Sequence, residues 1–394
     1  IRILNMNNFK RTLTLRNSVF LGLSSMIGAG LFVNIAPAAF VSSYSLLFGL
    51  FIASILAFSN ASSSAQLANL YPETGGTYLY ARKVLGNKAS LLAGFSFITG
   101  KVISSIAIAL TFGNYLFPSS HRLAGIALVA GVGIISYFGA TKTASVAKWF
   151  VYSVSGILFF YIFSVVSSEN FNFAIPVTEG LTTESLLLSS SIWFFAFTGY
   201  SRLATFGEEV KNPEVIIPKA ILTGLGITVL IYFLTTYATL GIIDPVIIQN
   251  SLTPLKVAFD ISRFSSFSFL ISIASTIATG SVLLALIPGI SRVIVAMSRD
   301  NYLPTLLGTI HKKYNSAYFA DILISVVVVM GILYFDVVEA IKMSSFFILL
   351  YYSLTNYSVI KLKKSQRLYS IFIAYFGLFG CLLLAGTLFL NFIK

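Results

Sequence analysis

Two apolar stretches of the sequence contain glycine where a membrane helix would otherwise run without interruption. In the first stretch Gly28 and Gly30 are two residues apart, and in the second Gly199 follows Thr198. Glycine costs about 1 kcal/mol relative to alanine inside a helix and permits backbone shapes that other residues avoid. We therefore expect both helices to break near their midpoints.

A broken helix in a membrane presents peptide groups that can bind a ligand. Its second half begins with unpaired N–H groups, and its first half ends with unpaired C=O groups. A zwitterion satisfies both, because its carboxylate suits the positive end of a half-helix and its ammonium suits free carbonyls. This places the carboxylate at Gly28, Ala29 and Gly30, and the ammonium near Phe195, Ala196 and Thr198. The alternative is that these glycines only let two helices approach closely.

The elements that hold these breaks are predicted to be membrane-spanning helices. Of the 394 residues 57% are hydrophobic and 10% charged, and the mean hydropathy is +0.89. A water-soluble domain does not tolerate this composition, whereas runs of roughly twenty apolar residues cross about 30 Å of hydrocarbon as helices. We expect an all-α membrane protein with about eleven spans, at 17–40, 46–70, 90–117, 123–137, 149–166, 185–206, 220–243, 267–290, 319–335, 341–360 and 368–392.

The two interrupted spans are the first and the sixth of this series. Interrupted helices in equivalent places indicate an inverted-repeat transporter whose substrate lies at the bilayer midplane. The chain then divides into an N-terminal segment with the first repeat (1–170), a second repeat (171–364) and an additional C-terminal helix (365–394). This division rests on spacing, since no sequence identity between the halves is evident.

The basic residues indicate orientation in the membrane. The net charge is +13, and a cytoplasmic N-terminus places most lysines and arginines in cytoplasmic loops, as the positive-inside rule requires. We therefore expect a multi-pass protein of the cytoplasmic membrane, in contact with lipid and with no nucleic-acid partner. The basic residues assigned to the outside are Arg122, Lys256, Arg263, Lys342 and Lys394.

Metal, cofactor and enzyme functions find little support in the residue types. Cys381 is the single cysteine, and both histidines, His121 and His311, fall in predicted loops. A disulfide or a metal cluster is therefore not expected. No nucleophile, base and orienting group cluster in the sequence, so we expect neither an enzyme nor a cofactor.

Four motifs follow one another along the chain: GLSSMIGAGLF at 22–32, YPETGGTY at 71–78, FAFTGY at 195–200 with EEVKNP at 208–213, and SRVIVAMSRDNYLP at 291–304. In this order, and over nearly the whole chain, they resemble the amino acid, polyamine and organocation (APC) superfamily of transporters. The resemblance implies a five-plus-five inverted repeat (LeuT-like fold) and alternating access. It also implies that the backbone from Ile27 to Gly30 holds the substrate carboxylate, and that Phe195 and Phe197 form an aromatic lid. Ordinary packing is the alternative for these rings, because the chain has 36 phenylalanines.

One departure from the family pattern leaves the coupling ion open. Proton-coupled members often carry a lysine in the fifth helix, where this sequence has Ser155. A sodium ion could instead bind near Gly28, with oxygen ligands from Ser155 and from Ser275, Thr276 or Thr279. Interhelical hydrogen bonding is the alternative for these hydroxyls.

Charged residues near or within the spans are candidates for coupling and gating. Lys101 lies deep in the third span, where a cavity-facing amine could carry the coupling proton or be a water-lined spectator. Arg202 is assigned to a structural or gating ion pair, and Glu208 to an inner gate. Segments 71–88 and 208–219 are expected to be cytoplasmic loops, with prolines 213 and 218 stopping helices.

The function expected from these features is secondary active transport of amino acids, by symport or exchange, with proton coupling preferred over sodium. A polyamine or amine carrier is an alternative, although it would normally need a carboxylate in its pocket. A membrane sensor that binds amino acids without transporting them is another. A channel is disfavoured, because no selectivity-filter segment is evident.

Overall fold

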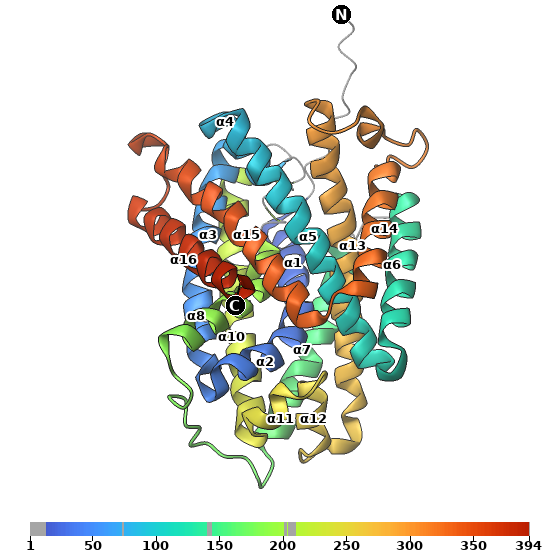
Figure 1. Cartoon of the computed structure of the whole chain (residues 1–394), viewed down its shortest axis with the longest axis vertical. Helices are drawn as coiled ribbons and strands as arrows, with labels where there is room; N and C mark the ends of the chain where they lie inside the picture. Colours follow the sequence, from blue (N-terminus) through green and yellow to red (C-terminus); the bar gives the residue numbers. More distant parts are fainter. Residues whose placement is uncertain (1–12, 73–74, 140–143, 201–202, 204–209, 394) are drawn as a thin grey trace, which may run out of the picture.

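The protein is a bundle of helices. The computed structural model describes residues 13–72, 75–139, 144–200, 203 and 210–393, and most of its long helices run roughly along the longest axis (Figure 1). Among these residues, eight helical stretches are long and apolar enough to cross a membrane, and a ninth apolar helix is shorter. The expectation of an all-α, multi-pass membrane protein is therefore confirmed.

The first predicted span consists of two helices, α1 (Leu15–Met26) and α2 (Ala29–Ser42). The Thr14 side chain caps the start of α1 by accepting a hydrogen bond from the backbone N–H of Asn17. Helical geometry is lost at Ile27, with ψ 63°, and at Gly28, with φ −126° and ψ −142°. The interruption therefore lies where the glycine pattern predicts it.

The sixth predicted span also departs from α-helical geometry near its glycine. Helix α8 (Thr183–Phe197) begins with a capping box between Thr182 and Ser185 and passes into the 3₁₀ turn η3 (Thr198–Tyr200). The rest of this predicted span, with Arg202, and the gate residue Glu208 lie outside the described residues.

The other helices fall into two groups along the chain. Between α2 and α8 lie η1 (Ser43–Ser45), α3 (Leu46–Leu70), α4 (Gly76–Leu85), α5 (Asn87–Leu116), η2 (Pro118–Ser120), α6 (His121–Tyr137) and α7 (Ala144–Val166). After η3 follow α10 (Pro213–Ile242), α11 (Pro245–Gln249), α12 (Pro254–Asp260), η4 (Ser265–Phe267), α13 (Phe269–Arg299), η5 (Thr305–Gly308), α14 (Tyr318–Tyr334), α15 (Val337–Ile360), η6 (Lys364–Gln366) and α16 (Ile371–Ile393).

Residues 213–219 of the predicted loop 208–219 are helical, and proline 218 does not stop a helix, contrary to the sequence expectation. Helix α10 begins at Pro213, whose missing N–H is not needed in the first turn, and continues through Pro218. Pro218 cannot donate to the carbonyl of Glu214, four residues earlier. The side-chain amide of Asn69 on α3 donates to that carbonyl instead, at 2.9 Å. A tertiary contact therefore compensates for the bond that proline removes.

The predicted loop 71–88 is likewise corrected, because most of it forms helix α4. The turn into α4 uses positive φ angles at Gly75 and Gly76. Tyr78 and Tyr80 then become buried, and α4 packs against α5 and α15. Helix α4 is short and has only one apolar face, so its sequence contains no long hydrophobic run that would indicate a helix.

Apolar side chains form both the interior and much of the outer surface of the bundle, unlike those of a soluble protein. Large apolar rings project from the bundle, including Trp149 on α7 and Phe372 on α16, which are 74% and 77% exposed. Polar side chains lie inside, where Asn60 of α3 accepts a hydrogen bond from Asn356 of α15 at 2.6 Å and donates to Cys381 of α16. Such interhelical hydrogen bonds stabilise bundles in lipid, where the hydrophobic effect between helices is weak.

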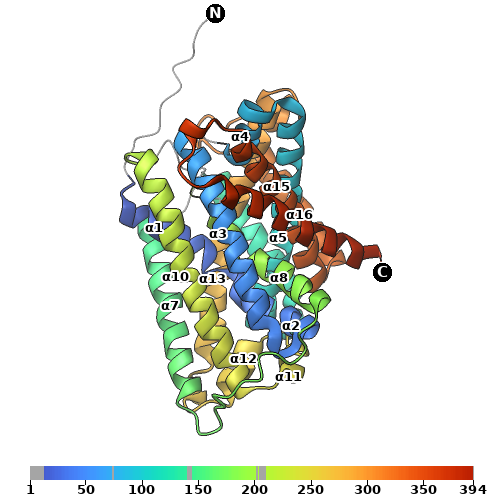
Figure 2. The same ribbon diagram turned by 90° about the vertical axis from the view of Figure 1, so that its left-hand side faces the viewer.

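Segments that the sequence analysis assigns to one side of the membrane lie at the same end of the bundle. Helix α4 and the connection from α13 to α14 lie at one end, and α11 and α12 lie at the other (Figures 1 and 2). The first group belongs to segments assigned to the cytoplasm, and the second to segments assigned to the outside. Segments that the charge pattern assigns to the same side of the membrane therefore lie close together in the fold.

Candidate functional site

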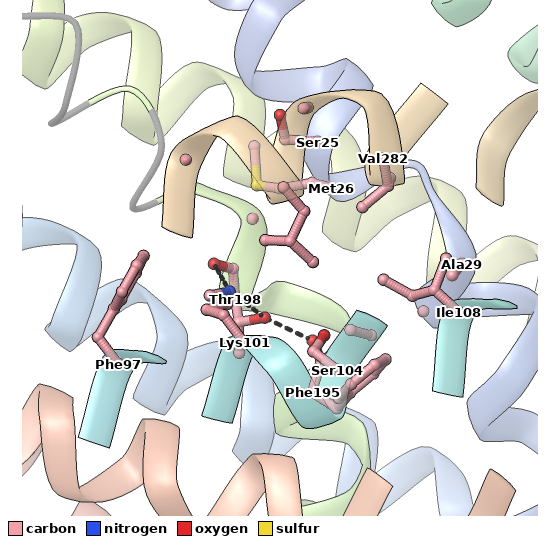
Figure 3. Close-up of a pocket in the computed structure, with 16 residues that line it drawn as sticks. Ser25, Met26, Ala29, Phe97, Lys101, Ser104, Ile108, Phe195, Thr198 and Val282 are labelled. Atoms are coloured by element: carbon pink, nitrogen blue, oxygen red, sulfur yellow. Dashed lines mark hydrogen bonds between the residues drawn. The ribbon is translucent and has the colours of Figure 1, made fainter. Parts of the chain in front are cut away.

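A cavity of about 70 Å³ lies where the two interrupted helices meet, with α5 and α13 completing its walls. One buried water needs about 10–15 Å³ on the same scale, so the cavity has room for a small ligand. Figure 3 shows its lining side chains. They are Ser25, Met26, Ala29 and Gly30 from α1 and α2; Phe195, Ala196, Thr198 and Gly199 from α8 and η3; Phe97, Lys101, Ser104 and Ile108 from α5; and Val282, Ala285, Leu286 and Gly289 from α13.

Three of the predicted binding residues lie beside the cavity without lining it. The backbone N–H of Ile27 donates to Leu23, and that of Gly28 donates to Met26, each at 2.7 Å. The ring of Phe197 packs against Tyr232 at a centroid distance of 5.4 Å. The N–H groups that remain for a ligand are those of Ala29 and Gly30, which begin α2.

Two glycines bring the interrupted helices into backbone contact. A Cβ atom on Gly30 would lie 2.5 Å from the Cα of Ala196, and one on Gly199 would lie 2.2 Å from the carbonyl oxygen of Ser25. Real Cβ contacts are not this short, so both positions require glycine. The same glycines therefore allow close packing and border the cavity. The two interpretations of these glycines, a binding site and a close helix contact, do not exclude each other.

Tyr232 of α10 links the two breaks, and the sequence analysis missed it. Its hydroxyl donates to the carbonyl oxygen of Met26, where α1 ends, and lies 3.3 Å from that of Ala196 in the last turn of α8. The side chain is fully buried. No local pattern distinguishes this residue among the 20 tyrosines of the chain.

Lys101 projects from the middle of α5 to Thr198, where the second interruption begins (Figure 3). Its Nζ donates to the backbone oxygen of Thr198 at 3.1 Å and to the Thr198 Oγ1 at 3.2 Å. That hydroxyl in turn donates to the carbonyl of Phe195 at 3.0 Å. Lys101 is only 5% exposed, and among the described residues that line the cavity it is the one ionisable side chain.

The hydroxyls proposed for a sodium site do not line this cavity. On α13, Thr276 and Thr279 donate to carbonyls of their own helix, those of Ser272 at 2.8 Å and Ser275 at 2.6 Å. Ser155 and Ser275 are also absent from the lining. The sodium alternative thus stays a prediction without support from the cavity.

One buried acid within the predicted spans was also missed. Asp321 of α14 is 3% exposed, and its carboxylate accepts a hydrogen bond from Ser291 of α13. A charged residue inside an apolar span is itself a signal of function. The sequence contains that signal, because Asp321 falls within the predicted ninth span.

At the end of the bundle assigned to the cytoplasm, α4 is bound to the end of α13. Asp300 accepts a hydrogen bond from the Tyr78 hydroxyl at 2.6 Å and pairs with the Arg82 guanidinium. Burial, with the hydrogen bond to Asp300, raises the pKa of Tyr78. The hydroxyl therefore remains protonated at physiological pH and can donate to the carboxylate.

A membrane bundle with a buried cavity between two interrupted helices has the architecture of a secondary transporter. Comparison with known proteins agrees: residues 13–393 match the model of the amino acid permease family. The chain belongs to this family, within the APC superfamily, and is a transporter rather than an enzyme.

Three relatives illustrate the range of similar proteins. An uncharacterised transporter of Mycobacterium tuberculosis is 35% identical over 97% of this chain and 87% of its own length. The branched-chain amino acid permease of Bacillus subtilis is 22% identical over 79% of this chain and 72% of its own length. The vacuolar cationic amino acid transporter 2 of Arabidopsis thaliana is 25% identical over 90% of this chain and 60% of its own length.

Proposed function

We propose that this protein is a secondary active transporter that carries an amino acid across the cytoplasmic membrane by alternating access. The observation that carries the proposal is the position of Ala29 and Gly30 at the start of α2, facing a buried cavity. The first N–H groups of a helix have no partner within it and bear partial positive charge. They suit the carboxylate that all amino acids share.

The order of helix lengths supports a five-plus-five inverted repeat. Helices α5, α6 and α7 have 30, 17 and 23 residues, and α13, α14 and α15 have 31, 17 and 24. Each series follows an interrupted helix. We infer that 1–170 and 171–364 are the two repeats, that 365–394 adds a further helix, and that the spans number eleven with a cytoplasmic N-terminus.

Proton coupling through Lys101 is the mechanism that we favour. A buried amine in contact with the second interruption changes its charge when it gains or loses a proton. That change would alter the hydrogen bonds that hold Thr198 in place. A sodium ion near Gly28, Ser155, Ser275 and Thr276 is the alternative.

Uptake into proteoliposomes tests the proposal. A panel of labelled amino acids is offered under an inward proton gradient, an inward sodium gradient and neither. We expect the proton gradient to accelerate uptake in the wild type, and Lys101→Ala to abolish that acceleration. Sodium-driven uptake would replace the proton mechanism with the sodium alternative, and proton-driven uptake by Lys101→Ala would remove this residue from coupling.

Counterflow separates transport from sensing. Liposomes loaded with unlabelled amino acid should accumulate labelled substrate if the protein completes its cycle. Binding without exchange would identify a sensor instead. A polyamine carrier is less favoured, because no carboxylate occurs among the described residues that line the cavity.

A further inference from the structure

The cavity is built to receive negative charge. Ala29 and Gly30 present the positive end of α2, and Lys101 presents an amine on the side of the cavity formed by α5. No Asp or Glu occurs among the described residues that line it. The one full charge that these lining side chains can contribute is therefore positive, while the C-terminal ends of α1 and α8 contribute partial negative charge.

Three carbonyl groups at the interruptions already accept hydrogen bonds from side chains of the protein. Tyr232 serves the oxygens of Met26 and Ala196, and Lys101 occupies that of Thr198. The position expected from sequence for a substrate ammonium is thus taken by an amine of the protein. A substrate ammonium can use only the second lone pair of these oxygens, close to a positive charge whenever Lys101 is protonated.

The balance of charge separates the classes of amino acid. A neutral zwitterion adds no net charge, and it leaves the buried Lys101 uncompensated when this amine is protonated. A cationic amino acid adds a second positive charge. An acidic amino acid brings one net negative charge and makes the complex neutral. Because an uncompensated buried charge is costly, the acidic substrate gives the most favourable arrangement of the three.

We propose that the transported substrate is an acidic amino acid. Its α-carboxylate binds the N–H groups at the start of α2, and its side-chain carboxylate pairs with protonated Lys101. Thr198 positions the Lys101 amine through its hydroxyl and carbonyl oxygens, 3.2 and 3.1 Å from Nζ. This inference rests on the proposed function and specifies its substrate class.

Glutamate and glutamine provide the decisive comparison, because they have nearly the same shape and differ in charge. The full-length protein in proteoliposomes is assayed for counterflow of each labelled compound, with aspartate and leucine as competitors. We expect the wild type to favour glutamate over glutamine at least roughly tenfold, and aspartate to compete better than leucine. Lys101→Gln should reduce that preference by at least roughly tenfold, and Lys101→Arg, which keeps the positive charge, should retain it.

Lys342→Gln is the matched control. Lys342 lies on α15, outside the cavity lining, and hydrogen-bonds Asn391 at 2.9 Å. This variant removes a cation from a membrane helix and should leave the glutamate preference unchanged. For any variant that does not transport, the thermal shift of the purified protein with glutamate or glutamine reports binding directly.

The outcomes distinguish this inference from the proposed function. Exchange of glutamine or leucine without glutamate would overturn the acidic substrate and leave amino acid transport intact. An unchanged preference in Lys101→Gln would overturn the role of Lys101. If no amino acid exchanges or binds, the proposed function fails, and the inference fails with it.

Discussion

At the scale of single residues, the two phenylalanines of the second interruption differ in what they face. Phe195 lines the cavity, whereas Phe197 is fully buried against Tyr232. We predict that Phe195→Ala raises the KM for substrate roughly tenfold, because the ring borders the ligand. Phe197→Ala should instead lower thermal stability more, since truncating a packed ring costs about 3–5 kcal/mol. KM and unfolding temperature in detergent check both, and equal effects on KM would contradict the assignment.

Tyr232 allows a second test at the residue scale. Tyr232→Phe removes the hydroxyl that bonds Met26 and Ala196, and losing one typical intramolecular hydrogen bond costs about 0.5–1.5 kcal/mol. Because both carbonyls belong to the interruptions, we expect roughly tenfold weaker substrate binding together with lower thermal stability.

The control for this change is Tyr161→Phe. Tyr161 is as buried as Tyr232, but its hydroxyl bonds Thr239 on α10 at 2.8 Å and does not line the cavity. This variant should lose thermal stability and keep its substrate affinity. Binding measured by scintillation proximity distinguishes the two, and equal affinities in both variants would refute the role of Tyr232.

At the scale of elements, two contacts between helices require glycine. Gly30 lets α2 approach α8, and Gly199 lets η3 approach α1. We predict that Gly30→Ala and Gly199→Ala each weaken substrate binding at least roughly tenfold, because the added Cβ would meet backbone atoms within 2.5 Å. Overpacking of this kind costs about 1–3 kcal/mol. Binding affinity and unfolding temperature are the measurements.

Gly226→Ala on α10 is the control for these glycines. A Cβ at this position would meet nothing within 4 Å, and alanine favours the helix by about 0.5–1 kcal/mol. Transport should therefore be unchanged and stability equal or higher. Normal binding by Gly30→Ala would show that the contact between α2 and α8 does not shape the site.

At the scale of the whole molecule, the orientation in the membrane can be tested with introduced cysteines. Cys381 is fully buried, so it should give little background labelling by a membrane-impermeant maleimide. We predict that Lys312→Cys, in the connection from α13 to α14, is labelled only from the cytoplasmic side. Arg263→Cys, after α12, should be labelled from the outside. The reverse pattern would overturn the charge-based orientation.

The properties that depend on composition and on local backbone preference could be predicted from the amino-acid sequence alone. A mean hydropathy of +0.89 requires a lipid environment, and glycine at positions 28 and 199 marks where two helices lose regular geometry. The predicted start of α10, at residue 220, was wrong because it relied on a local signal. Proline is a local signal for a helix end, and the contact from Asn69 that cancels it lies far away in sequence.

Which groups meet at the cavity depends on how the helices pack against one another. Lys101 donates a hydrogen bond to Thr198, which lies 97 positions later in the chain. Tyr232 donates one to Met26, which lies 206 positions earlier. The same packing turns Ala29 and Gly30 toward the cavity, while the N–H of Gly28 bonds to Met26. The physical reason is that pairing of buried polar groups depends on how helices cross, and the periodicity of a single helix does not specify its partners.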